Sequence, residues 1–466
     1  MGLDAEKGKY TSPEGCKTWE YLCILACAIL AGSIGCIVGW NSPSIVILMA
    51  EDSPIPVTAS AVSTLVAIVG VGNVLAPPIN YFIVDKFGRK LTMLLSVLPL
   101  LISWGMITIA TSIWELYVAR LLAGIALGLF VCVCPMYIGE VSSLDTRGAG
   151  SSLAGILYNV GILVTFLVAP HLSLSMMSGI FLLVNIGFAI AFWCMPESPY
   201  FLAMQNRTDE AEDVLVKLRG KTDVSEELQI IIDSLSTSEK ESVKRGGLKD
   251  IFTSRANFRA LVCIMLFSVT HHFGGFFAIL VYGQLIFKSM SNVISDYTLN
   301  IMIGVTQVIS ALLTTFLVDK LGRKPLILAS GVTAAICNLV IGVYFYAMEY
   351  TRANVSSYLW VPFISAIILI FTFNCGLVCL QVILMSEMFA AEVKAIGMCL
   401  VSVSGGLLGT FGCKLYIWIA ISLNYGHSVP FLFYFVIVAV CTWIICRITP
   451  ETKGKSFAEI QKELAK

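Results

Sequence analysis

Twelve long apolar segments restrict the possible folds of this 466-residue chain more than any other feature. A helix needs about 20 apolar residues to cross the hydrocarbon core of a bilayer. The segments lie at 20–42, 59–83, 91–111, 114–138, 149–171, 174–195, 258–287, 297–318, 326–348, 359–386, 395–423 and 428–448. Only 13% of the residues are charged, against about 25% in soluble domains. We therefore predict an all-α membrane protein with twelve transmembrane helices.

The Lys and Arg residues gather on one side of these predicted spans. They occur in the loops after the second and eighth segments and throughout 196–257, whereas none lies between Gly39 and Tyr81. Basic loops face the cytoplasm in multi-pass proteins. We therefore predict that both termini are cytoplasmic, and we place the protein in the plasma membrane.

These boundaries divide the chain into five parts. They are a cytoplasmic tail (1–18), a six-helix half (19–195), a cytoplasmic linker (196–257), a second six-helix half (258–448) and a second cytoplasmic tail (449–466). Within the linker, 208–219 begins with a Thr and two acids and ends with Lys217, Arg219 and Gly220, the pattern of a capped surface helix. A second helix is expected around 225–236. The linker is either a solvated tether or a helical bundle that braces the two halves, and the capping favours the bundle.

A seven-residue motif occurs once in each half. Residues 84–90 read VDKFGRK and residues 318–324 read VDKLGRK. The pair Glu140 and Arg147 has the same spacing as the pair Glu387 and Lys394, and Pro-Glu-Ser at 196–198 recurs as Pro-Glu-Thr at 450–452. Three pairs in the same order indicate a duplicated six-helix unit, and parallel repeats of this kind occur in transporters built from two six-helix halves.

Charged residues at the ends of spans are costly unless they are paired. We therefore predict a cytoplasmic gate whose ion pairs latch the halves together and break when the protein opens inward. The alternative is that these charges only orient the helices. The gate candidates are Asp85, Arg89, Arg120, Glu140, Arg147, Asp319, Arg323, Glu387 and Lys394.

Five strings carry a resemblance to a known family. They are VDKFGRK (84–90), YIGEVSSLDTRG (137–148), PESPYFL (196–202), VDKLGRKPL (318–326) and PETKGKSF (450–457). With these five strings in this order, the chain resembles the sugar porter family of the major facilitator superfamily. The runs GWNSPSIVIL (39–48) and DSPIPV (52–57) are similar to its insect trehalose-transporter-like branch.

The resemblance implies solute transport by alternating access, with a hexose or disaccharide bound between the halves near the bilayer midplane. It places His271 and His272 where the family has two Gln on the seventh helix, Asn159 and Gln307 at its fifth- and eighth-helix amides, and Gln381 where Pro is usual. Aromatic side chains would cover the apolar face of a sugar ring. The expected solute-binding residues are Trp40, Asn159, His271, His272, Phe276, Phe277, Gln307 and Gln381.

Two adjacent histidines in the seventh span bear on whether transport is coupled to protons. His titrates near neutral pH, so His271 and His272 could be satisfied by neighbouring helices, contact the solute or carry protons. Proton-coupled members of the family typically carry an acid in the first helix, where this chain has only Glu20 at the mouth. We therefore favour a facilitator. The alternatives are a non-transporting sensor with a transporter fold and a carrier of a different small organic solute.

Other classes of function find no support in the sequence. The net charge of zero disfavours a nucleic-acid partner. No nucleophile–base arrangement, phosphate loop or metal-ligand spacing indicates an enzyme, a cofactor or a metal. The expected partners are the lipid bilayer and a small solute such as a sugar or polyol, with no obligatory protein partner. Asn354 begins a glycosylation sequon in a predicted outside loop.

Overall fold

The computed structural model describes residues 17–50, 53, 55–242, 248–288, 295–351, 355–389, 393–451 and 462–464. All regular elements within these ranges are helical. Twelve of the described helical stretches are long and apolar enough to span a membrane. The predicted all-α membrane fold with twelve spans is confirmed.

The N-terminal half contains seven helices, because the first span is divided at Trp40. They are α1 (Thr18–Gly39), α2 (Asn41–Leu48), α3 (Ala59–Phe87), α4 (Arg89–Ile109), α5 (Ile113–Val141), α6 (Leu144–Val168) and α7 (Leu174–Trp193). Residues 196–242 of the linker form three helices with a small apolar core of their own. They are α8 (Pro199–Met204), α9 (Thr208–Arg219) and α10 (Ser225–Ser242).

The C-terminal half follows a short helix, α11 (Leu248–Thr253). Its α-helices are α12 (Arg255–Phe273), α13 (Phe276–Ile286), α14 (Asp296–Leu321), α15 (Arg323–Tyr350), α16 (Trp360–Thr372), α17 (Cys379–Met388), α18 (Lys394–Ile417) and α19 (Ser428–Ile448). A 3₁₀ turn (Ser356–Tyr358) precedes α16, and π-helical segments follow α16 (Phe373–Val378) and α18 (Trp418–Ser422).

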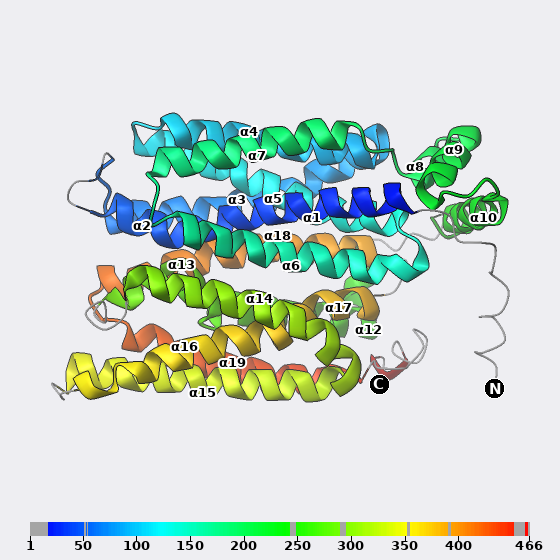
Figure 1. The fold of residues 1–466 in the computed structure, drawn as a ribbon. Helices are drawn as coiled ribbons and strands as arrows, with labels where there is room; N and C mark the ends of the chain where they lie inside the picture. The colour runs from blue at the N-terminus through cyan, green and yellow to red at the C-terminus, as the bar shows by residue number, and fades with distance from the viewer. Residues whose placement is uncertain are drawn as a thin grey trace.

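The two halves lie side by side as elongated bundles, and α8–α10 lie at one end of the molecule (Figure 1). We call this end the linker end and the opposite end the far end. Both copies of the seven-residue motif form the turn between two helices, α3–α4 and α14–α15. Gly88 and Gly322 sit at those turns with φ of 88° and 82°, a conformation that glycine adopts without a steric penalty.

The halves contact each other through α3 with α18 and α6 with α14. At the first contact Thr410 Oγ1 donates to the carbonyl of Ala67 at 3.1 Å. A Cβ on Gly70 would lie 2.3 Å from the Thr410 hydroxyl, so the absence of a side chain there allows the two backbones to approach. Small residues serve the same purpose in other membrane helix pairs.

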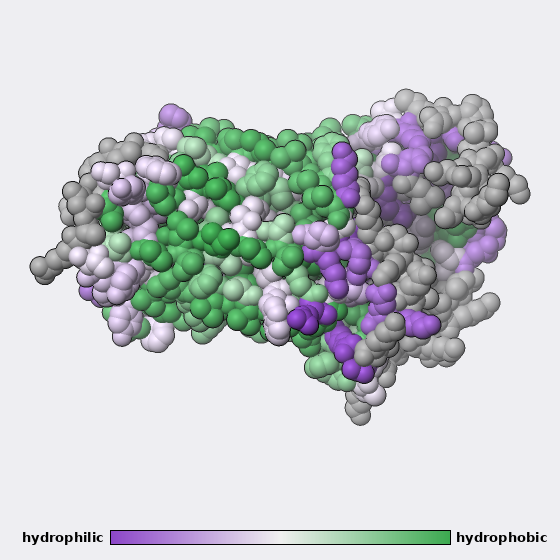
Figure 2. Space-filling model, turned by 90° about the horizontal axis from the view of Figure 1, so that it is seen from below, coloured by the Kyte–Doolittle hydropathy of each residue, from purple (hydrophilic) through white to green (hydrophobic). Residues whose placement is uncertain are grey.

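The outer surface of the spans is apolar. Figure 2 shows hydrophobic side chains covering the middle of one face and hydrophilic ones gathered toward the linker end. Phe82, Ile190 and Phe316 are each at least two-thirds exposed. An apolar surface of this extent on a helical bundle fits contact with lipid.

Candidate functional site

The seventh span is broken in its middle. Helix α12 ends at Phe273 and α13 begins at Phe276, with Gly275 at φ 82° between them. Asn338 of α15 donates its side-chain amide to the carbonyl of Gly274 at 2.9 Å. This bond satisfies a backbone group released by the break. Discontinuous helices of this kind form solute sites in many transporters.

The tenth span is irregular at a position that faces this break. The π-helical segment Phe373–Val378 separates α16 from α17, and such insertions are frequent at functional sites. The rings of Phe276 and Phe373 stack with centroids 5.4 Å apart and an interplanar angle of 16°. A Cβ on Gly274 would lie 2.4 Å from the Phe373 ring. The two irregular segments are therefore in direct contact.

The two adjacent histidines lie just before the break and have different surroundings. The ring of His271 lies 5.5 Å from Phe276 and 6.1 Å from Phe277, centroid to centroid. The Nδ1 atom of His272 lies 2.9 Å from the carbonyl oxygen of Ser268. A Cβ on Gly409 of α18 would come within 3.0 Å of the His272 ring. The His272 ring also lies 5.4 Å from Phe277, centroid to centroid. Both histidines thus belong to the aromatic cluster, and His272 packs against α18 as well.

Amide side chains from three helices surround these aromatic residues. Gln381 of α17 donates to the Ser268 hydroxyl at 2.7 Å. Asn374 donates to the backbone carbonyl of Gln307 at 3.1 Å and to the Ser310 hydroxyl at 2.7 Å. The side chain of Gln307 is 1% exposed, and its Nε2 has no hydrogen-bond partner among the described residues. These contacts bring His271, His272 and the predicted C-terminal amides into one cluster.

Sequence reasoning did not identify two members of this cluster, Asn338 and Ser268. A polar side chain within an apolar span is itself a signal of function or of helix contact. The fifth-helix candidate Asn159 belongs to the other half. Its amide donates to Gly155 of its own helix at 2.9 Å.

Arg120 was expected in the cytoplasmic gate, and that assignment is wrong. It lies near the start of α5, about 30 Å along the helix from Glu140 at 1.5 Å per residue. Its guanidinium donates to the carbonyl of Ile37 at 3.1 Å and to the side chain of Asn41 at 2.6 Å. It also lies 4.8 Å from the ring centre of Trp40. Both Arg120 and Trp40 are fully buried, so Trp40 supports the far end of the first span and lies outside the aromatic cluster.

The far end holds a polar contact between the two halves. The hydroxyl of Ser42 in α2 donates to the side-chain carbonyl of Asn300 in α14 at 3.1 Å. The backbone N–H of Gln284 in α13 approaches the same hydroxyl at 3.5 Å. All three residues are buried, so the path between the halves is closed there.

The linker end holds an ion-pair network in each half. In the N-terminal half, Arg89 pairs with Glu140 at 2.9 Å and with Asp85 at 3.2 Å, and Ser198 donates to Glu140. In the C-terminal half, Arg323 pairs with Glu387 at 2.9 Å. Each of these pairs joins helices of the same half.

Among the further gate candidates, Arg147 does not join these networks. It is exposed and has no ion pair within the described residues. The side chains of Asp319 and Lys394 lie outside the described part of the structure, as does the whole of Asn354.

Two acids that sequence reasoning left without a role complete the networks. Glu197 accepts the backbone N–H groups of Arg89 and Lys90, both at 3.0 Å. Glu451 accepts those of Arg323 and Lys324, again at 3.0 Å. Each carboxylate therefore caps the helix that follows the motif glycine. Burial raises the pKa of Glu197, although the backbone N–H groups of Arg89 and Lys90 oppose the rise. The repeated Pro-Glu dipeptide was the sequence signal for this role.

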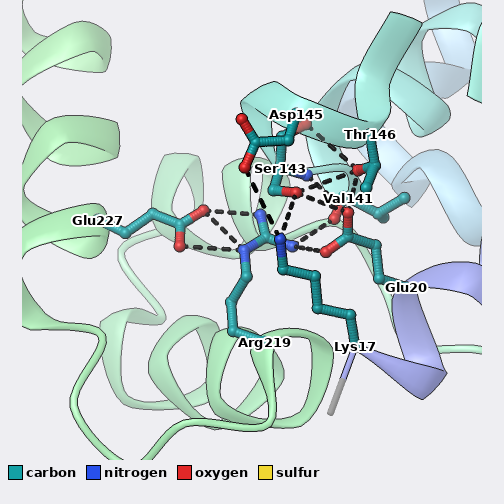
Figure 3. A network of polar contacts seen from close by, with 8 residues as sticks. All are labelled: Lys17, Glu20, Val141, Ser143, Asp145, Thr146, Arg219 and Glu227. Carbon is teal, nitrogen blue, oxygen red and sulfur yellow. Dashed lines mark hydrogen bonds and ion pairs between the residues drawn. The ribbon is translucent and has the colours of Figure 1, made fainter. Parts of the chain in front are cut away.

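The linker helices dock on the N-terminal half through a buried acid (Figure 3). Glu20 of α1 is 0% exposed and pairs with Arg219 of α9 at 2.7 Å. Arg219 also donates to the carbonyl of Val141 at 2.8 Å and pairs with Glu227 at 2.6 Å. Burial acts to lower the pKa of Arg219, but the two carboxylates raise it above its ordinary value. The predicted helical linker is thus anchored to α1 and to the end of α5.

The sequence model of the family described as "Sugar (and other) transporter" matches residues 49–464. The facilitated trehalose transporter Tret1 of Bombyx mori is 26% identical over 453 residues, which cover 96% of this chain and 87% of that protein. The sugar transporter ERD6-like 6 of Arabidopsis thaliana is 27% identical and covers 94% of this chain and 89% of that protein.

Solved structures show the same fold. The inward open conformation of the xylose transporter XylE from E. coli superposes with a TM-score of 0.77 at 20% identity, covering 95% of this chain and 99% of that one. Its partially occluded inward open conformation has a TM-score of 0.75 at 22% identity, covering 94% and 100%.

Proposed function

Because the chain belongs to the Sugar (and other) transporter family, we propose that it moves a sugar or polyol across a membrane by alternating access, without ion coupling. The observation that carries this proposal is the contact between the broken seventh span and the π-helical segment of the tenth. Two interrupted helices that meet within a bundle supply free backbone groups and side chains for a solute without exposing them to lipid.

The contacts at the two ends support alternating access. The far end is closed by Ser42 and Asn300 across the halves, whereas the ion pairs of the linker end lie within each half. Rocking the halves about the α3–α18 and α6–α14 contacts would break the Ser42–Asn300 bond between the halves. It would leave the ion pairs within each half intact. We propose that the linker end faces the cytoplasm, since the basic loops lie there, and that the ion-pair networks position the motif loops that meet when this end closes.

The chemistry of the cluster suits a hydroxylated ring. Gln381, Asn374 and His271 offer groups that exchange hydrogen bonds with hydroxyls, and Phe276 and Phe277 offer apolar planes. The unpartnered Nε2 of Gln307 makes a solute acceptor favourable, because a buried donor without a partner costs about 1–3 kcal/mol. A hydroxyl oxygen of the solute would satisfy it.

The surroundings of Arg120 favour downhill transport. A proton-coupled carrier needs a group that gains and loses a proton at each half-cycle. Arg120 stays charged, and its partners are the amide of Asn41 and the carbonyl of Ile37, neither of which titrates. The His271–His272 pair is the group that we would test for proton coupling.

The test is uptake into liposomes that contain the purified protein. We expect counterflow of one or more of trehalose, glucose and a polyol series, unaffected by a pH gradient, and reduced when His271 is changed to Ala. Unchanged uptake and affinity in both His271→Ala and His272→Ala would refute a solute-binding role for the pair. Binding of a sugar without uptake would instead support the sensor alternative.

We further propose a plasma-membrane location with cytoplasmic termini. A glycan at Asn354 would place its loop outside, which matches this orientation. Labelling of introduced cysteines in intact and permeabilised cells would test the orientation, and treatment with an endoglycosidase would test the glycan.

A further inference from the structure

A cleft of about 600 Å³ opens at the linker end between α1 and α6. It lies within the N-terminal half, away from the aromatic cluster and the two ion-pair networks. Its lining includes Lys17, Tyr21, Ile24, Asp145, Ala149 and Leu153.

The lining changes from polar to apolar with depth. Lys17 immediately precedes α1 and Asp145 lies in the first turn of α6, where the spans leave the bilayer. Ile24 and Leu153 lie two turns further along the same helices, about 10 Å deeper at 1.5 Å per residue. Tyr21 is 57% exposed between these levels, a position that tyrosine often takes at a membrane interface. This order of groups matches a phospholipid, with its headgroup above and an acyl chain below.

The polar end presents one charge of each sign. The Lys17 side chain is only 15% exposed, and its Nζ lies 3.4 Å from the Ser143 hydroxyl and 3.9 Å from Asp145 (Figure 3). The Asp145 side chain is 84% exposed, so its carboxylate can accept further hydrogen bonds from outside. A fixed cation beside an accessible anion complements a headgroup that carries a phosphate and an ammonium group.

We propose that this cleft binds one phosphatidylethanolamine molecule from the bilayer. Its phosphate contacts Lys17, its primary ammonium group donates to Asp145, and an acyl chain lies along Ile24, Ala149 and Leu153. A choline headgroup has no N–H to donate to Asp145. An anionic headgroup without an amine places negative charge beside that carboxylate. The inference requires only that the chain spans a membrane and is independent of the solute.

The experiment is native mass spectrometry of the purified full-length protein with dioleoyl phosphatidylethanolamine, phosphatidylcholine or phosphatidylglycerol. We expect one phosphatidylethanolamine to be retained about two- to fivefold better than phosphatidylcholine, the size of an exposed ion pair. Asp145→Asn should reduce this ratio to about one. Ala149→Trp should fill the cleft and remove the specific binding while leaving both charges in place. Lys86→Gln removes an exposed cation at the same end and outside the cleft, and should leave the ratio unchanged.

Equal retention of the three lipids by the unchanged protein would overturn the proposal. So would a preference for phosphatidylethanolamine that survives both Asp145→Asn and Ala149→Trp. Melting temperatures within the range of the Lys86→Gln control would confirm that the variants are folded. Equal loss of all lipids in Lys86→Gln and in Asp145→Asn would mean that general surface charge, and not this cleft, determines retention.

Discussion

The two halves carry the same motif but hold its arginine differently. The Arg89 side chain is 8% exposed and contacts Glu140 and Asp85, while Ser198 donates to Glu140 from the start of the linker. The Arg323 side chain is 14% exposed and pairs with Glu387, which is itself 25% exposed. The Nε of Arg323 has no hydrogen bond within the described residues. Among the described side chains, the N-terminal arginine–glutamate pair is therefore the more buried.

The helix caps use equivalent residues in the two halves. Glu197 and Glu451 each accept two backbone N–H groups at 3.0 Å from the residues after the motif glycine, but Glu197 accepts both at Oε1 and Glu451 accepts one at each carboxylate oxygen. The repeat has thus kept the cap and the arginine–glutamate pair and has changed their detail. The linker helices dock on the half whose arginine–glutamate pair is more buried, through Glu20 and Arg219.

The largest difference is expected when each arginine is removed. Arg89→Met leaves Glu140, whose side chain is only 16% exposed, without its cation, and breaking a largely buried pair costs about 3 kcal/mol. Arg323→Met should cost about 1.5 kcal/mol, nearer to one charged hydrogen bond, because its partner is more exposed. Denaturant unfolding in detergent, with Lys86→Met as the control, would compare the two. Equal losses would mean that the halves are equivalent in strength despite their different burial.

The second-largest effect is expected when the docking contact of the linker is broken, and it should be confined to the N-terminal half. Arg219→Met removes the cation from the buried Glu20, but Glu20 keeps its hydrogen bonds from Ser143 and Thr146. The cost should therefore be about 2 kcal/mol, below that of Arg89→Met. We expect hydrogen exchange in α9 and α10 to rise about 30-fold, at 1.4 kcal/mol per factor of ten. Arg207→Met is the matched control, since Arg207 is half exposed and pairs within the linker with Glu210. Equal exchange in the two variants would show that apolar packing alone holds the linker.

The cap variants should show how far the repeats differ. Glu197→Gln can keep one oxygen that accepts both N–H groups, and it loses mainly the charge at a helix start, which is worth about 1 kcal/mol. Glu451→Gln also loses one of its two acceptor oxygens, so its loss of unfolding free energy should be larger by about 1 kcal/mol. Equal losses would show that the two caps are equivalent in strength despite their different hydrogen bonding.

The sequence predicted the spans and the repeat because these depend on local composition and on strings that can be compared directly. It could not predict the break at Gly274–Gly275, since two glycines in an apolar run are equally compatible with close helix packing. Glu20 was recognised at the mouth of the first span, but its partner Arg219 is 199 residues away. Arg120 was assigned to the wrong end, although the predicted topology already starts the fourth span, 114–138, on the side away from the cytoplasm.

The smallest expected effect concerns the far end, where the contact crosses between the halves. Ser42→Ala removes the hydrogen bond to Asn300, and one such bond is worth about 1 kcal/mol. The population open at the far end should therefore rise about fivefold, which spin labels on α2 and α14 would measure as a longer distance. Ser44→Ala is the matched control, because Ser44 is equally buried in α2 and its hydroxyl has no partner within the described residues. If both variants change the distance distribution equally, packing of α2 and not the Ser42 hydrogen bond closes this end. If only Ser42→Ala does so, the far end is held by contacts between the halves, and the linker end, in this conformation, by contacts within them.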